Sequence, residues 1–322
     1  KEFILYGKLT SEDEFSSIDL SEVLEARIDV QNPSFLLEVL LERFRELNFD
    51  ERYDMQANLT PNIEFIFGPP GTGKTTHLAD KVLIPMMKAE QPAKVLVLTP
   101  TNKAADVLTT RIIEKMGTNT SYQSWLVRFG TSSDERIEEA GVWRDRTFDI
   151  SGLNHAVTVT TIARFAYDGF AGKKLNEMKW DAIVIDEASM ISLISIIYPL
   201  YQQKPQKFII AGDPFQIEPI VAIEEWKDEN IYKMIGLNQK GSFAKPITQP
   251  HDYLVTNLET QYRSIPAIGE VFSRFTYDGI LKHYRKSETQ RPLKLNGIDV
   301  QPVNLIKFPV SKYESIYCAK RL

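Results

Sequence analysis

The chain has 322 residues, 43% of them hydrophobic and 25% charged, with a formal net charge of −5, which is a globular composition and excludes disordered, fibrous and disulfide-scaffold proteins. A single cysteine, Cys318, cannot form an internal disulfide, and the four His residues do not have the spacing of a zinc or iron–sulfur site. We therefore expect the protein in a reducing compartment, which is the cytoplasm or, in a eukaryote, the nucleus. No stretch approaches the roughly 18 uninterrupted apolar residues of a membrane span, so we expect no contact with a membrane.

The beginning of the chain is acidic. Residues 1–54 hold 6 Lys and Arg against 14 Asp and Glu, a net charge of −8, which leaves residues 55–322 at +3. Within this part, apolar residues recur every three or four positions from Pro33 to Leu47, which predicts a helix. We therefore expect an acidic helical segment over residues 1–46. The weak positive charge of the remainder does not by itself identify a nucleic-acid binder.

From Asn62 onward, short apolar runs alternate with helical patterns. The runs, which we predict to be strands buried on both faces, are Ile63–Phe67, Lys94–Leu98, Ala156–Val159, Ala182–Ile185 and Lys207–Ile210. The helical patterns are Thr75–Met87, Asn102–Lys115 and Ile191–Tyr201. This order predicts an α/β fold with a parallel sheet covered by helices. The polar segment 117–152 interrupts the alternation for longer than an ordinary loop, and we interpret it as an inserted subdomain.

A phosphate-binding loop directly follows the first of these strands. It consists of Gly68, Pro69, Pro70, Gly71, Thr72, Gly73, Lys74, Thr75 and Thr76. Its glycines let backbone amides curl around the phosphates of a nucleotide, Lys74 is expected to reach the β- and γ-phosphates, and Thr75 to hold Mg²⁺. A glycine-rich turn is the alternative, but the strand before the motif and the helix after it favour a nucleotide site.

Two later strands end in polar residues with chemistry suited to hydrolysis. After Ala182–Ile185, Asp186 is a candidate Mg²⁺ ligand and Glu187 a candidate base for the attacking water. After Lys207–Ile210, Gln216 is a candidate to bond the γ-phosphate or that water. Taken singly, the acidic pair also fits a helix N-cap and the second loop a turn, and the phosphate loop upstream favours the catalytic interpretation.

A fourth element runs from Leu258 to Pro266 and carries Arg263, which is followed by an aromatic stretch that includes Tyr277. An arginine can stabilise the charge that develops during phosphoryl transfer. Arg263 is therefore a candidate catalytic residue, and the alternative is an ordinary surface arginine.

Together these segments resemble, in chain order, the ATPase motifs of superfamily-1 helicases. The matching segments are Gly68–Thr76, Leu98–Asp106, Val159–Arg164, Asp186–Ser189, Gly212–Gln216 and Gln261–Arg263. The phosphate loop and the Gln261-Tyr262-Arg263 triplet look most like the branch that contains the nonsense-mediated-decay and Okazaki-fragment-processing helicases. The resemblance covers roughly Leu47 to Leu281.

The resemblance implies two RecA-like domains that bind ATP and Mg²⁺ between them and move along single-stranded DNA or RNA in the 5′-to-3′ direction. The first domain would cover residues 47–258 and the second would begin in 259–322. The residues implied to face the nucleic-acid backbone are Pro100, Thr101, Asn102, Thr160 and Thr161. Short polar side chains suit contacts to phosphate that do not read sequence, and the alternative role for Thr101 or Asn102 is a helix N-cap.

The chain departs from the family pattern in two informative places. Glu51 stands where relatives use a Gln to read adenine, and a carboxylate cannot donate to a ring nitrogen, so the nucleotide preference stays open. Val303–Phe308 resembles the first core strand of the second domain, and the family's last two motifs are not found in this sequence. We therefore expect flanking domains in a longer chain.

The leading interpretation is an ATP-hydrolysing helicase or translocase. One alternative is an ATPase, stimulated by nucleic acid, that remodels complexes without unwinding. Another is a degenerate nucleotide-binding regulatory module, which the presence of Lys74, Asp186, Glu187, Gln216 and Arg263 disfavours.

Overall fold

The computed structural model describes residues 63–91, 93–219, 230–235, 237 and 254–286. It also gives the backbone of two antiparallel pairs, β1 (Ile4–Lys8) with β2 (Phe15–Asp19) and β15 (Leu293–Leu295) with β16 (Ile298–Val300). The helix predicted over Pro33–Leu47, the adenine-reading position Glu51 and the strand predicted over Val303–Phe308 lie outside the described residues.

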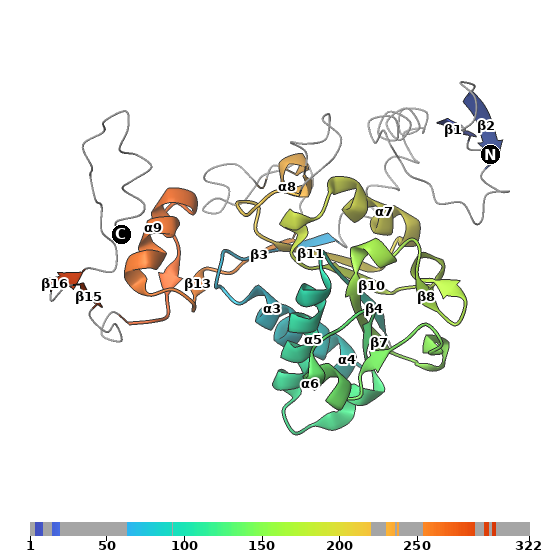
Figure 1. The fold of residues 1–322 in the computed structure, drawn as a ribbon, viewed down its shortest axis with the longest axis horizontal. Coiled ribbons are helices and arrows are strands. Elements are labelled where there is room, and N and C mark those ends of the chain that lie inside the picture. Colours follow the sequence, from blue (N-terminus) through green and yellow to red (C-terminus); the bar gives the residue numbers. More distant parts are fainter. Residues whose placement is uncertain are drawn as a thin grey trace.

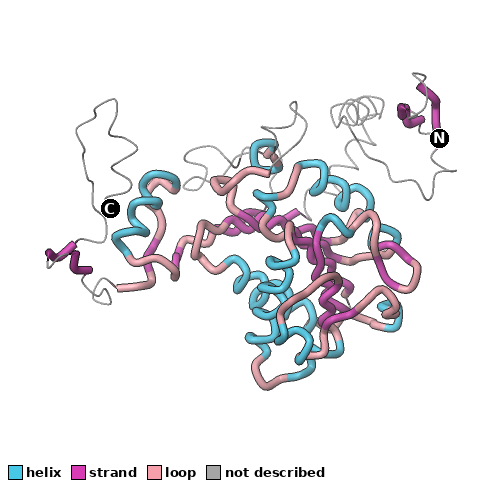
Figure 2. Tube along the Cα trace, viewed as in Figure 1, coloured by secondary structure: helices cyan, strands magenta, loops and turns pink. Residues whose placement is uncertain are grey.

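A parallel sheet of eight strands organises the described chain (Figures 1 and 2). Its order is β12-β3-β11-β10-β4-β7-β5-β6, and every neighbouring pair is parallel. The strands are β3 (Ile63–Phe67), β4 (Lys94–Thr99), β5 (Leu126–Phe129), β6 (Trp143–Arg144), β7 (Ala156–Thr161), β10 (Ala182–Ile185), β11 (Lys207–Gly212) and β12 (Leu254–Asn257). The prediction of an α/β fold with a RecA-like parallel sheet is confirmed, and the five strands predicted between residues 63 and 210 are present.

Helices cover this sheet, as the sequence predicted (Figure 2). They are α3 (Lys74–His77), the π-helical segment η2 (Leu78–Leu83), α4 (Ile84–Lys88), α5 (Asn102–Met116), α6 (Glu135–Glu139), α7 (Leu193–Gln203), α8 (Ile231–Met234) and α9 (Pro266–Thr276). Short 3₁₀ turns are η3 (Thr120–Ser124), η4 (Ile150–Gly152), η5 (Ile162–Arg164), η6 (Leu175–Glu177) and η7 (Ala188–Met190). No helix in the described ranges has the length and apolar character needed to cross a membrane.

The helix predicted over Thr75–Met87 is present but not uniform. It runs as α3, η2 and α4 in succession, with wider π turns in its middle. Pro85 stands at the start of α4 and has no N–H to donate to the preceding turn, so a regular α-helical bond is missing there.

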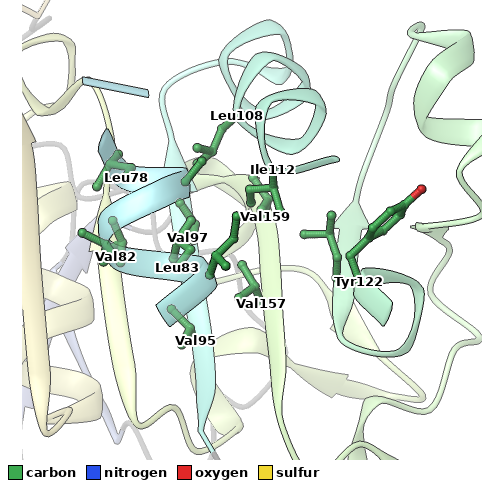
Figure 3. Close-up of a cluster of buried hydrophobic side chains, with 14 of the residues drawn as sticks. Leu78, Val82, Leu83, Val95, Val97, Leu108, Ile112, Tyr122, Val157 and Val159 are labelled. Atoms are coloured by element: carbon green, nitrogen blue, oxygen red, sulfur yellow. The ribbon is translucent and has the colours of Figure 1, made fainter. Parts of the chain in front are cut away.

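The core lies on both faces of the sheet because successive side chains of a strand point in opposite directions. In β4, Val95 and Val97 pack with η2 and α5, whereas Leu96 and Leu98 pack with α7 and α8 on the other face. Figure 3 shows the first of these clusters, in which Leu78 and Leu83 lie against strand valines. Burial on both faces explains why the strands read as continuous apolar runs.

Residues 117–152, which we interpreted from the sequence as an inserted subdomain, contribute two strands to the main sheet. Strands β5 and β6 of this segment join the sheet edge next to β7. The pattern concealed them because β5 contains Arg128, which is fully buried and donates to Asp106 of α5 at 2.8 Å. A buried ion pair thus replaces an apolar contact within the strand. The other domain boundaries, at residues 47 and 259, stay predictions.

Two smaller strand pairs complete the described chain. β8 (Gly169–Phe170) and β9 (Lys173–Lys174) form an antiparallel hairpin after β7. β13 (Thr260–Gln261) and β14 (Lys282–His283) pair in parallel, with α9 between them in sequence. This α9 unit, residues 260–283, lies beside the end of β3 in a small apolar cluster of Phe67, Tyr277 and Leu281.

Candidate active site

The loops that follow β3, β10 and β11 meet at one edge of the sheet, because the carboxyl ends of parallel strands lie together. The N–H of Gly68, at the start of the phosphate loop, donates to the carbonyl of Gly212 at 3.0 Å. The N–H of Asp186 donates to the carbonyl of Leu98 at 3.0 Å. Lys74 of the phosphate loop also lies 3.7 Å from Glu187, so the structure brings together three motifs that are far apart in sequence.

The phosphate loop has the backbone shape that its glycines permit. Gly71 and Gly73 have φ values of +78° and +82°, a region that other residues rarely adopt. A Cβ on Gly68 would lie 2.3 Å from Cγ of Lys74, so the lysine stem needs a residue without a side chain at that position. Thr72 closes the loop by donating its hydroxyl to the carbonyl of Pro69 at 2.7 Å.

Lys74 is buried at the start of α3 with only 7% of its surface exposed. Its Nζ donates to the carbonyl of Gly68 at 2.9 Å and lies 3.7 Å from Oε2 of Glu187. A cation held in this way, beside loop amides at a helix N-terminus, is suited to bind a phosphate group.

Asp186 is 2% exposed and accepts the N–H of Glu187 at 2.9 Å. Burial, and then the charge of Glu187, raise the pKa of Asp186 to about 7, while Lys74 and the Glu187 N–H oppose that rise. A bound divalent cation would stabilise the charged carboxylate in this environment.

These residues fit a magnesium–nucleotide complex. Mg²⁺ prefers oxygen ligands and usually binds through one or two protein groups plus phosphates and water. The described residues contain no cluster of three or more His, Cys, Asp or Glu that would form an all-protein metal cage. The carboxylate of Asp186 and the hydroxyl of Thr75 are therefore the appropriate kind of donors for a metal that arrives with phosphates.

Glu187 has an unusual backbone and a buried oxygen that lacks a hydrogen-bond donor. Its φ of +51° places it in the left-handed region, which is uncommon for a residue other than glycine. Its Oε2 accepts no hydrogen bond from the described residues, although it lies 3.7 Å from Nζ of Lys74. Backbone strain and a buried carboxylate oxygen without a hydrogen bond are typical of functional sites, and this oxygen can accept a proton from water.

Gln216 follows a loop that is organised by Asp213. Asp213 is fully buried, and its Oδ1 and backbone carbonyl each accept an N–H at 3.1 Å, from Phe215 and Gln216 respectively. Burial raises the pKa of Asp213, while hydrogen bonds from Tyr277, Phe215 and Gln216 and the charge of Lys74 lower it. The loop is thus a turn whose geometry is set by Asp213, and the role of Gln216 stays a prediction.

The backbone and Cβ of Arg263 lie directly beside the phosphate loop. The N–H of Tyr262 donates to the carbonyl of Gly71 at 2.8 Å, and a Cβ on Gly71 would lie 2.7 Å from Cβ of Arg263. Gln261 stabilises the turn that positions Arg263. The Gln261 side chain accepts from the N–H of Ser264 at 2.8 Å and donates to the Ser264 carbonyl at 2.9 Å. The arginine side chain itself is exposed.

The residues predicted to contact nucleic acid fall into two groups. Thr101 and Asn102 are exposed at the end of β4, with Pro100 partly exposed, and the hydroxyl of Thr101 also caps α5 by accepting the N–H of Ala104 at 3.1 Å. By contrast, Thr160 is fully buried and Thr161 is 8% exposed. The helix-cap alternative therefore holds for Thr101, and its contact with nucleic acid stays a prediction.

Two tyrosines lie in the candidate site but were not predicted from the sequence. Tyr277 donates its hydroxyl to Oδ2 of Asp213 at 2.6 Å, although 64 positions separate them. Tyr232 of α8 is 2% exposed, and its hydroxyl has no hydrogen-bond partner among the described residues. The charges of Asp213, Glu187 and Asp186 act with burial, the largest cause, to raise the pKa of Tyr232 well above its ordinary value. No local pattern marks either tyrosine.

Replacing Gly212 with alanine is expected to destabilise the fold. The new Cβ would lie 2.2 Å from the Tyr232 hydroxyl and 3.1 Å from the backbone nitrogen of Ala188, so the buried tyrosine must move. Overpacking of this kind costs about 1–3 kcal/mol. Urea unfolding should show this loss, and adding Tyr232→Phe, which removes the clashing oxygen, should restore part of it. Gly152→Ala, where nothing lies within 4 Å, is the matched control. Equal stability of Gly212→Ala and the parent would contradict this close approach.

Comparison with known protein families supports the interpretation of this chain as a nucleotide-binding domain. Residues 54–222, which are more than half of the chain, match the AAA domain family. The chain belongs to the AAA domain family. The prediction of a superfamily-1 helicase of the nonsense-mediated-decay and Okazaki-fragment branch is confirmed as well.

Three curated helicases illustrate the relatives of this AAA-domain chain. "DNA replication ATP-dependent helicase/nuclease dna2" of Schizosaccharomyces pombe is 28% identical over 83% of the chain and 18% of its own length. "Probable RNA helicase armi" of Drosophila melanogaster is 26% identical over 67% of the chain and 21% of its length. "Regulator of nonsense transcripts 1 homolog" of the same fly is 25% identical over 83% of the chain and 24% of its length. The chain thus spans under a quarter of each of these relatives.

Proposed function

We propose that this AAA-domain protein hydrolyses ATP with Mg²⁺ and uses the energy to move along single-stranded nucleic acid and so to separate paired strands. The observation that carries the proposal is the convergence of the phosphate loop, Asp186–Glu187 and Arg263 at one edge of a parallel sheet. Such an edge is where ligands of open α/β sheets bind.

The phosphate loop would bind the nucleotide. Amides of residues 68–76 surround the phosphates, and Lys74 contacts their β- and γ-oxygens. Thr75 and Asp186 would hold Mg²⁺, which supplies positive charge to the same oxygens. The 3.7 Å separation of Lys74 from Glu187 supports a single site, because both side chains already face one space.

Hydrolysis would then proceed by in-line attack of water on the γ-phosphorus. Glu187 accepts a proton from the water as the new P–O bond forms, and the bond to the ADP oxygen breaks. Gln216 orients the water or the γ-phosphate, and Arg263 stabilises the negative charge on the transferring group. The buried Oε2 of Glu187, which accepts no hydrogen bond from the described residues, supports its role as proton acceptor.

A surface for nucleic acid would lie at the end of β4, where Pro100, Thr101 and Asn102 are accessible. Polar side chains and backbone groups there suit hydrogen bonds to phosphates without reading bases. The names of the relatives include both DNA and RNA helicases, so the type of strand is an outcome of experiment. The 5′-to-3′ direction is implied by the resemblance to the family.

Binding of single strands by the full-length protein is expected to weaken steeply as salt rises and to depend little on sequence, because most contacts would go to phosphates. Fluorescence anisotropy with DNA and RNA oligonucleotides across a salt series measures both properties. ATPase activity should rise when a single strand is added.

The remaining candidate functions predict different results in the same assays. A remodelling ATPase would show stimulation by strands without displacing a paired strand. A regulatory module would show the same low ATPase rate with and without nucleic acid, and that result would rule out the proposed function.

A further inference from the structure

Tyr277 lies at the end of α9, but its hydroxyl reaches the edge of the sheet where the candidate active site lies. It caps the helix by donating its N–H to the carbonyl of Ser273 at 2.8 Å. Its hydroxyl donates to Oδ2 of Asp213 at 2.6 Å, and Tyr277 and Asp213 are 3% and 0% exposed. A hydrogen bond to a buried carboxylate is charge-assisted and costly to lose.

Asp213, which accepts this hydrogen bond, also holds the loop that contains Gln216. Asp213 accepts the N–H groups of Phe215 and Gln216, and the Gln216 side chain bonds to its carboxylate. Without the hydroxyl of Tyr277, one oxygen of this buried carboxylate loses its donor. The loop must then shift to find another donor or admit water.

The ring of Tyr277 makes contacts that do not depend on the hydroxyl. It lies edge-on to Phe215 and Phe272, with ring centroids 5.8 Å and 6.3 Å away. It also packs in the apolar cluster with Phe67 and Leu281. A phenylalanine would keep this packing, so Tyr277→Phe removes the hydrogen bond to Asp213 and leaves the ring contacts in place.

The α9 unit contacts the site at a second point. At its beginning, the N–H of Tyr262 holds the carbonyl of Gly71, and Arg263 lies next to that contact. One continuous segment therefore holds the phosphate loop near Arg263 and the Gln216 loop near Tyr277. A displacement of this segment would move both loops together.

We propose that Tyr277 is a positioning residue for ATP hydrolysis, which holds Gln216 in place through Asp213 and ties it to the segment that carries Arg263. This inference rests on the proposed ATPase function. It adds a side chain that touches neither nucleotide nor water and acts only through Asp213 and Gln216.

The first test is steady-state ATPase kinetics of the full-length Tyr277→Phe protein. We expect kcat to fall about tenfold while KM for ATP stays close to that of the parent, and we expect the urea unfolding midpoint to fall because a buried carboxylate loses a hydrogen-bond donor. Tyr198→Phe is the matched control, because it removes a tyrosine hydroxyl that accepts from Asn176 at 3.0 Å, outside the site. An unchanged kcat in Tyr277→Phe would overturn the proposal.

A double-mutant cycle separates positioning from general stability. In a Gln216→Ala background, Tyr277→Phe should lower kcat by less than about twofold, because the residue through which it acts is gone. A full tenfold effect in that background would mean that Tyr277 does not act through Gln216, and would overturn the proposal.

Hydrogen exchange distinguishes failure of this inference from failure of the ATPase function. The amides of Phe215 and Gln216 should exchange faster in Tyr277→Phe than in the parent, because their acceptor Asp213 is no longer held. Absence of ATPase activity in the parent protein would refute the proposed function, and this exchange measurement would still decide whether Tyr277 holds the loop. Unchanged exchange would show that it does not.

Discussion

Lys74→Ala is expected to abolish ATP hydrolysis and to weaken nucleotide binding. The substitution removes the buried cation that lies 2.9 Å from the Gly68 carbonyl and 3.7 Å from Glu187, where the β- and γ-phosphates would bind. Loss of one preorganised donor to a reacting oxygen costs about 10²–10³-fold in turnover, and Lys74 would also contribute to binding. ATPase rates and titration with a fluorescent ATP analogue measure the two effects.

The control for Lys74→Ala is Lys81→Ala in η2, one of the helical segments that follow the phosphate loop. The Lys81 side chain is 67% exposed and pairs with Asp80 at 3.4 Å, away from the phosphate loop. This control should keep the parental rate. If Lys74→Ala also kept it, the assignment of residues 68–76 as the phosphate site would be wrong.

Arg263→Ala is expected to reduce turnover by about 10³-fold or more while nucleotide binding changes little, because an arginine of this kind acts chiefly on the transition state. The position of its Cβ beside Gly71 places the side chain within the neighbourhood of the phosphate loop. Single-turnover hydrolysis with saturating ATP separates the chemical step from binding.

Arg274→Ala is the matched variant for Arg263→Ala. Arg274 belongs to the same α9 unit, but its side chain is 75% exposed and pairs with Glu270 of the same helix. It should hydrolyse ATP at the parental rate. Undiminished turnover by Arg263→Ala would remove that arginine from the site and leave the transition-state charge to Lys74 and Mg²⁺.

Local sequence patterns were sufficient to predict most elements of the sheet. Strands such as β4 and β10 are continuous apolar runs because both of their faces are buried, and the glycines of the phosphate loop mark a backbone that other residues cannot adopt. Both features can be predicted from residues that are adjacent in the sequence. Strand β5 was missed because Arg128 interrupts its apolar pattern. Its burial depends on Asp106 in α5 and on oxygen atoms of Asn102 and Thr131, which accept from its guanidinium.

The fold class, the phosphate loop and the family could all be predicted from sequence, because each is signalled by motifs whose residues are close together in the chain. Which distant residues support the site became visible only in three dimensions. Tyr277 bonds to Asp213 across 64 positions, and Tyr232 lies against Gly212, because the sheet and α9 unit bring these segments together. Their roles depend on distance and burial in three dimensions, and neither quantity is present in the order of the residues.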